Sequence, residues 1–104
     1  MDKKIDRIIR QYISTVSSQT PGFVKAYLFG SFAKGNQRPE SDIDIALIIE
    51  NLKESEKFDI QVQLMLLAAK FDSRIEPHPI SPEDLISDNP FVYEIRKTGI
   101  EISK

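Results

Sequence analysis

The run at residues 42–49, Asp-Ile-Asp-Ile-Ala-Leu-Ile-Ile, constrains the fold of this chain most strongly. Acidic and apolar residues alternate at its start, which predicts a β-strand whose successive side chains point to opposite faces. Asp42 and Asp44 then share one face, and the apolar residues between and after them need a core on the other. Two neighbouring carboxylates repel each other, and a divalent cation removes that cost. The pair indicates either a metal site or two solvated carboxylates at a strand end.

Composition supports one small core and excludes several kinds of site. The chain has 104 residues, a common size for one domain, so we expect a single domain over residues 1–104. It has no cysteine and one histidine, which excludes disulfides, thiolate metal sites and sites built from several histidines. A net charge of −2 argues against general nucleic-acid binding. Since no apolar run is long enough to cross a bilayer and the polar start lacks a signal peptide, we expect a cytoplasmic protein without membrane contacts.

Apolar periodicity and turn residues predict an α/β (α+β) fold with helices on a small sheet. Apolar residues recur at steps of three and four over residues 2–18, which is typical of a helix, and residues 23–29 have the composition of a strand. Two later helix starts are indicated by the capping box Ser-Pro-Glu-Asp and by the pair Asn-Pro. The expected elements are helices at 2–18, at 54–71, after Ser81 and after Asn89, and strands at 23–29, 42–49, 73–78 and 100–102.

The short strand expected at residues 73–78 carries Glu76 and His78 on one face. Pro77 and Pro79 lack N–H groups, and their alternate spacing removes donors from the same edge. We therefore expect an edge strand that pairs through its other edge. A lone histidine in such a place is typical of packing or hydrogen bonding rather than catalysis.

The helix expected at residues 54–71 has two apolar stripes, about 200° apart at 100° per residue, where a surface helix usually has one. One interpretation is a helix buried on two sides by its own domain. The other is that one stripe contacts a partner protein, and the pattern alone leaves both open. The first stripe is Phe58, Val62, Met65 and Ala69, and the second is Ile60, Leu64, Leu67 and Phe71.

A Gly-Ser pair directly follows the first expected strand. Gly30 allows the backbone to come close to a ligand, and Ser31, near the N-cap of a short helix, can donate its hydroxyl. A helix N-terminus offers free N–H groups and the positive end of the helix dipole, which suits phosphate. Alone, the pair is typical of an ordinary turn. Followed by a strand that opens with two aspartates, it predicts a phosphate cradle beside a metal platform.

Together these residues resemble the nucleotidyltransferase signature of the DNA polymerase β superfamily, G-S-x-A-x-G followed by S-D-x-D. The small size and the run Arg-Ile-Glu-Pro-His-Pro-Ile from residue 74 are similar to the minimal nucleotidyltransferases of prokaryotes. The resemblance implies a nucleotidyltransferase fold, a small mixed β-sheet flanked by helices. It also implies transfer of a nucleoside monophosphate from a triphosphate to a hydroxyl, with two Mg²⁺ ions on three carboxylates. The signature positions are Gly30, Ser31, Ala33, Gly35, Ser41, Asp42 and Asp44.

The resemblance implies a metal and catalytic role for three carboxylates. Asp42 and Asp44 would bind both metal ions, and Glu76 would be the third ligand on the neighbouring strand. Glu76 is one methylene longer than the aspartate often found at this position in the superfamily. Its alternatives are Asp72 and Glu83, or a Glu76 that is only a solvated edge-strand carboxylate.

The resemblance also implies how ATP is held. Gly30 and Ser31 would bind the β- and γ-phosphates. Lys34 and Arg38 are near enough in the sequence to contact phosphate, although most exposed basic residues do not.

Minimal nucleotidyltransferases of this type resemble the antitoxins of two-gene prokaryotic modules whose toxin is a helical HEPN-domain ribonuclease. The resemblance implies an ATP- and Mg²⁺-dependent protein adenylyltransferase that transfers AMP to a tyrosine hydroxyl of the toxin and silences it. One alternative is an antitoxin with an inactive site that neutralises by binding, which three retained carboxylates disfavour. The other is an enzyme with a small-molecule acceptor, like aminoglycoside nucleotidyltransferases, which the absence of an extra drug-binding domain disfavours.

Overall fold

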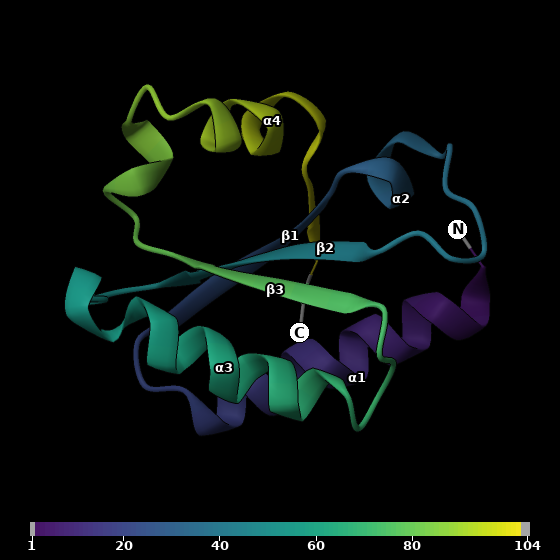
Figure 1. Cartoon of the computed structure of the whole chain (residues 1–104), viewed down its shortest axis with the longest axis horizontal. Coiled ribbons are helices and arrows are strands. Elements are labelled where there is room, and N and C mark those ends of the chain that lie inside the picture. Colours follow the sequence, from purple (N-terminus) through teal and green to yellow (C-terminus); the bar gives the residue numbers. More distant parts are fainter. Residues whose placement is uncertain (1, 103–104) are drawn as a thin grey trace.

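The computed structural model describes residues 2–102 and contains a four-stranded sheet between two layers of helices (Figure 1). Its elements are α1 (Lys3–Gln19), β1 (Phe23–Phe29), α2 (Ser31–Lys34), β2 (Ile43–Ile49), η1 (Glu54–Glu56), α3 (Lys57–Ala68), β3 (Ile75–Ile80), η2 (Asp84–Ile86), α4 (Pro90–Thr98) and β4 (Ile100–Ile102). In the view of Figure 1, α1 and α3 lie below the sheet, and α2 and α4 lie above it. The predicted order of helices and strands is confirmed.

The sheet is mixed and has the strand order β3-β2-β1-β4. β1 is antiparallel to β2 and to β4, and β2 is parallel to β3. β3 is an edge strand, as Pro77 and Pro79 predicted. It begins at Ile75 rather than at residue 73, because the Arg74 N–H donates to the Asp72 carboxylate at 2.9 Å and forms a turn before the strand.

The larger core lies between the sheet and the layer of α1 and α3. Within it, the Tyr12 hydroxyl of α1 donates to the carbonyl oxygen of Leu64 in α3 at 2.9 Å, so this buried polar group is satisfied. The alternation of β2 sends its apolar residues into this core, as predicted. Those residues are Ile43, Ile45, Leu47 and Ile49, all buried.

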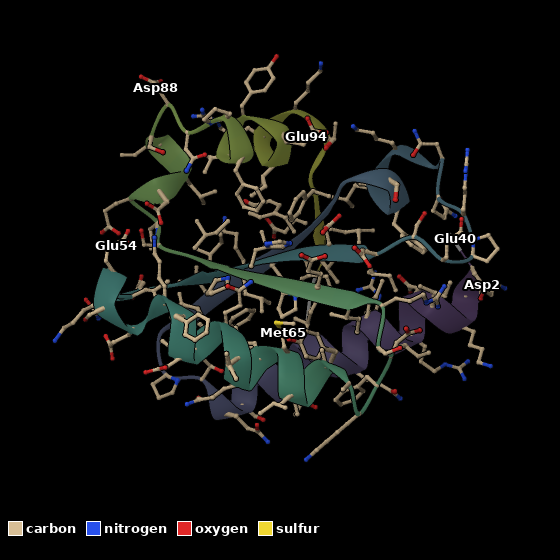
Figure 2. The ribbon with its side chains drawn as sticks, viewed as in Figure 1. Asp2, Glu40, Glu54, Met65, Asp88 and Glu94 are labelled. Carbon is tan, nitrogen blue, oxygen red and sulfur yellow. The ribbon has the colours of Figure 1, made fainter. Side chains whose placement is uncertain are left out.

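Helix α3 places its two apolar stripes in different surroundings. In the second stripe Leu64 is 4% exposed, and its companions Ile60, Leu67 and Phe71 pack against the core. The first stripe faces solvent: Phe58 is 74% exposed and Met65, labelled in Figure 2, is 48% exposed. The interpretation that the domain itself buries both stripes is therefore wrong for this fold.

A smaller apolar cluster covers part of the opposite face of the sheet, beneath α4 and η2. It buries alternate residues of the strands, and the carboxylates of Asp44 and Glu76 point to the same face but lie outside it. This face is therefore divided between a packed end and a polar end. The buried members are Phe29, Ala46, Ile48, Ile80 and Ile95.

Two helices are shorter than the sequence pattern predicted. α3 ends at Ala68 rather than at residue 71, because the N–H groups of Lys70 and Phe71 bond carbonyls three residues back instead of four. The capping box forms both of its hydrogen bonds, between Ser81 and Asp84, but only the turn η2 follows, since Ser87 is extended. Among the helices of residues 2–102, none has the length and apolar composition needed to cross a membrane.

Candidate active site

The candidate site forms where three neighbouring strands bring polar residues to one face of the sheet. Phe29, the last residue of β1, pairs with Asp44 of β2, so the Gly-Ser turn begins beside that aspartate. Asp44 pairs in turn with Glu76 of β3. Residues far apart in the sequence, Gly30, Asp44 and Glu76, are thus brought side by side, as the proposed site requires.

Gly30 packs directly against Asp44, and its position requires a glycine. Its backbone has φ 76° and ψ −152°, a conformation essentially restricted to glycine. A Cβ atom added there would lie 2.6 Å from Oδ2 of Asp44, closer than such atoms approach. The sequence predicted that the backbone at Gly30 comes close to a phosphate. In the structure it comes close to the Asp44 carboxylate.

The helix that follows Gly30 is a single turn of four residues, Ser31–Lys34. Gly30, not Ser31, is its N-cap residue, and no side chain caps it. Ser31 therefore lies next to the N-cap, as expected, and is the first residue of the helix. The first turn still presents N–H groups without partners inside the helix, and they lie at the Asp44 end of the sheet.

A carboxylate cluster lies beside this turn. Ligand atoms of Asp44, Glu76 and His78 all lie within 4.8 Å of one another. Burial raises the pKa of Glu76, a hydrogen bond to the Asp42 carboxyl raises it further, and the charge of His78 acts in the opposite direction. Asp42, just before β2, therefore also reaches the cluster, and the three predicted carboxylates are brought together.

This donor set fits a divalent cation. Glu76 resists ionisation partly because Asp42 and Asp44 are negatively charged neighbours. A cation among these oxygens would remove that repulsion, and carboxylate oxygens are the protein ligands that Mg²⁺ prefers. Asp42, Asp44 and Glu76 are the residues that could hold it.

The two basic residues predicted to contact phosphate are Lys34, which binds another partner, and Arg38, which lies exposed on a loop. The Lys34 ammonium forms an ion pair at 2.6 Å with Glu94 of α4, which is labelled in Figure 2. The same contact holds the pKa of Glu94 below its usual range. Arg38 is exposed on the loop after α2. Among residues 2–102, no contact holds the side chain of Lys34 or Arg38 toward the carboxylates.

The alternative carboxylates lie elsewhere. Asp72 forms a two-pronged ion pair with Arg74, at 3.0 and 2.8 Å, and this contact holds the pKa of Asp72 below its usual range. Glu83 is exposed in the turn before η2. Of the three candidates for the third carboxylate, Glu76 alone is paired in register with Asp44.

Two residues of this region were not among the predicted site residues. His78 lies in the ligand cluster, with its Nε2 atom 3.2 Å from Oδ1 of Asp44. Phe91 of α4 packs on the His78 ring at 5.0 Å between centroids. The shared face of Glu76 and His78 was a signal for the first, whereas no pattern in the sequence placed α4 over β3.

Comparisons with known proteins agree with the fold. No curated protein matches the chain significantly. A proposed nucleotidyltransferase from Sulfolobus solfataricus has a TM-score of 0.66 and 23% identity, over 95% of this chain and 79% of that one. A toxin–antitoxin structure with AMP-PNP gives 0.61 and 24%, over 88% and 70% of the two chains.

A third similar structure is a complex of a tri-AMPylated Shewanella oneidensis HEPN toxin with its MNT antitoxin. Its TM-score is 0.58 at 18% identity, over 92% of this chain and 70% of that one. At these identities the likeness shows the fold. The family model for polymerase beta nucleotidyltransferases matches residues 11–104, which include every residue of the site. The chain therefore belongs to the polymerase β nucleotidyltransferase family.

Proposed function

We propose that this chain is an antitoxin that transfers AMP from ATP to a tyrosine hydroxyl of a partner HEPN ribonuclease toxin. The observation that carries the proposal is the convergence of Gly30, Asp44 and Glu76 on one sheet face, in a chain of the nucleotidyltransferase family. Two structures similar to this chain support the choice of reaction, since one was solved with AMP-PNP and the other with an AMPylated toxin.

ATP would bind with its β- and γ-phosphates on the turn after β1. The first N–H groups of α2 have no partners inside the helix and would donate to the phosphate oxygens. The Ser31 hydroxyl would add a further donor. Lys34 would exchange Glu94 for a phosphate oxygen, and Arg38 would reach the phosphates from its exposed loop. The α-phosphorus is then held beside Asp44, because Gly30 contacts that side chain.

The transfer forms one bond and breaks one bond at the α-phosphorus. The acceptor oxygen bonds to phosphorus, and the oxygen bridging to the β-phosphate leaves with the electron pair as part of pyrophosphate. We assign the proton of the acceptor hydroxyl to the Glu76 carboxylate. Two Mg²⁺ ions, when bound to Asp42, Asp44 and Glu76, would supply charge neutralisation for the phosphates and the leaving group.

A protein acceptor needs a surface on which to dock, and the solvent-facing stripe of α3 is suitable. Exposed apolar side chains gathered on one helix often mark a protein interface. Here Leu66, 68% exposed, extends the stripe. The proposed docking surface consists of Phe58, Val62, Met65 and Leu66.

The proposal is tested by incubating the protein with labelled ATP, Mg²⁺ and the HEPN protein encoded beside it. We expect the toxin to gain one or more AMP masses and to stay inactive as a ribonuclease after the two proteins are separated. A toxin that stays unmodified and regains activity on separation would instead identify an antitoxin that acts by binding. Label transferred to a small molecule such as an aminoglycoside, and not to protein, would contradict the choice of acceptor.

A further inference from the structure

The side chain of His78 is mostly buried and lies against the carboxylates. It follows Glu76 by two residues on β3 and lies opposite Ala46, so its side chain points to the face of the site. The side chain is only 19% exposed, and its Nε2 atom is 3.2 Å from Oδ1 of Asp44. Because Oδ2 of the same aspartate faces Gly30, Asp44 links the phosphate turn to the imidazole.

Aromatic packing fixes the direction of the imidazole. The ring lies 5.3 Å from Phe29 and 5.0 Å from Phe91, measured between centroids. Phe91 meets Phe29 edge-on, at 90° between ring planes, so the three rings form one cluster. The prolines on either side of His78 also restrict the backbone. The ring is thus packed between these aromatic side chains while its Nε2 atom lies 3.2 Å from Oδ1 of Asp44.

The distances suit three ligands of one ion. Adjacent ligands of an octahedral ion lie about 3 Å apart, and opposite ones about 4.2 Å, when each bond is about 2.1 Å. The separation between Nε2 of His78 and Oδ1 of Asp44 is 3.2 Å, and with a Glu76 oxygen all three ligand atoms lie within 4.8 Å. Only small shifts would bring this set onto one ion.

We propose that His78 is a nitrogen ligand of the ion held by Asp44 and Glu76, and that this ion position prefers Mn²⁺ to Mg²⁺. The proposal rests on the proposed function only in taking these carboxylates as a metal site. Mg²⁺ favours oxygen ligands and loses little when an imidazole is absent. Mn²⁺ shares the preference for carboxylates. As a softer, d-block ion it also binds imidazole nitrogen more readily than Mg²⁺ does. The family resemblance implied three carboxylates, so the imidazole adds a different kind of ligand.

The first test is calorimetric titration of Mn²⁺ and Mg²⁺ into untagged protein without nucleotide or partner. We expect Mn²⁺ to bind at least about tenfold more tightly than Mg²⁺. The variant His78→Gln places an amide at the reach of Nε2, and it should weaken Mn²⁺ binding by about 10- to 100-fold while changing Mg²⁺ binding less than about threefold. Glu83→Gln, an exposed carboxylate outside the cluster, is the control and should change neither affinity.

The second test is pulsed electron paramagnetic resonance of bound Mn²⁺. Since the chain has one histidine, a directly coupled imidazole ¹⁴N signal can come only from His78. We expect that signal in the wild type and its loss in His78→Gln. Absence of the coupling, equal weakening of both metals in the variant, or no metal binding at all would overturn the proposal, and equal weakening would make His78 a positioning residue for Asp44.

These readouts separate this proposal from the proposed function. A nitrogen-coupled Mn²⁺ in a protein that transfers no AMP would support the ligand assignment and contradict the adenylyltransferase. AMP transfer by a protein whose bound Mn²⁺ shows no nitrogen coupling would do the reverse.

Discussion

The two faces of the central sheet come from the same strands but serve different purposes. On one face, β2 buries only apolar side chains under α1 and α3. On the other, Asp44 stands at the polar end, and Ala46 and Ile48 pack beneath α4. Because a strand alternates its side chains, one short segment supplies both core and site. Changes on the polar face should therefore remove activity and spare the fold, and changes on the apolar face should unfold the domain.

The strongest test of that division is removal of one carboxylate charge. Asp44→Asn and Asp42→Asn should each lower AMP transfer at least about 1000-fold, equivalent to about 4 kcal/mol, because the metal loses an anionic ligand. The melting temperature without metal should stay the same or rise, since a like-charge contact with Glu76 is removed. Transfer rates and thermal melts measure the two effects. Activity within about tenfold of wild type in either variant would contradict the site.

The matched control is Ile45→Asn, the same new side chain one residue along β2 on the other face. Ile45 is fully buried in the larger core. An amide placed there has no partner and costs several kcal/mol, so the variant should be largely unfolded by circular dichroism. Similar stability of Ile45→Asn and Asp44→Asn would show that the faces are not divided as described.

Helix α3 shows a similar contrast between a buried and an exposed side. Leu64→Glu should unfold the domain, because an ionised carboxylate in the core costs several kcal/mol. Met65→Glu, on the neighbouring but half-exposed position, should change the melting temperature by only about 1–2 °C. If the exposed stripe docks the toxin, Met65→Glu should also weaken the complex in a pull-down. A domain that unfolds with either substitution would show that the exposed stripe is structural.

The two apolar stripes of α3 show what the sequence pattern could and could not predict. The two stripes have the same composition and spacing, so the pattern identified both but could not choose the one facing the sheet. That choice depends on the complete layer of α1 and α3, where the Tyr12 hydroxyl bonds the Leu64 carbonyl. The information lies in contacts between residues 52 positions apart, outside any local window.

The site was predictable where its residues share one segment or one motif. Alternation alone placed Asp42 and Asp44 on one face, and the motif resemblance pointed to Gly30. The position of Glu76 beside Asp44 depends on the parallel register of β2 and β3, which local periodicity does not set. The surroundings of His78 were harder to predict, because Phe91 reaches it from α4, and local end signals predict that helix but not its place over the sheet.

The turn after β1 allows a smaller test of the same division. Gly30→Ala should cost about 1–3 kcal/mol of stability from its backbone conformation, and its Cβ should displace the Asp44 carboxylate. We expect transfer by the folded molecules to fall about 100-fold, near 2.7 kcal/mol. Gly22→Ala is the control, because it also has positive φ and its Cβ would lie 2.8 Å from the Glu50 carbonyl oxygen, at the other end of β2. Chemical denaturation and single-turnover transfer separate the two effects, and equal activity loss in both would assign the effect to strain alone.

The smallest effect is expected from the hydroxyl of the same turn. Ser31→Ala removes one donor from the proposed phosphate cradle and leaves the backbone N–H groups of α2 in place. A single hydrogen bond to a charged group contributes about 1.5–3 kcal/mol, so the KM for ATP should rise roughly 10- to 100-fold, less than the loss from either aspartate. Ser14→Ala, on an exposed position of α1 across the sheet, should leave the KM unchanged. Steady-state kinetics with varied ATP measure both. An unchanged KM in Ser31→Ala would mean that the backbone alone holds the phosphates, and a loss as large as that of Asp44→Asn would place the hydroxyl in the chemical step instead.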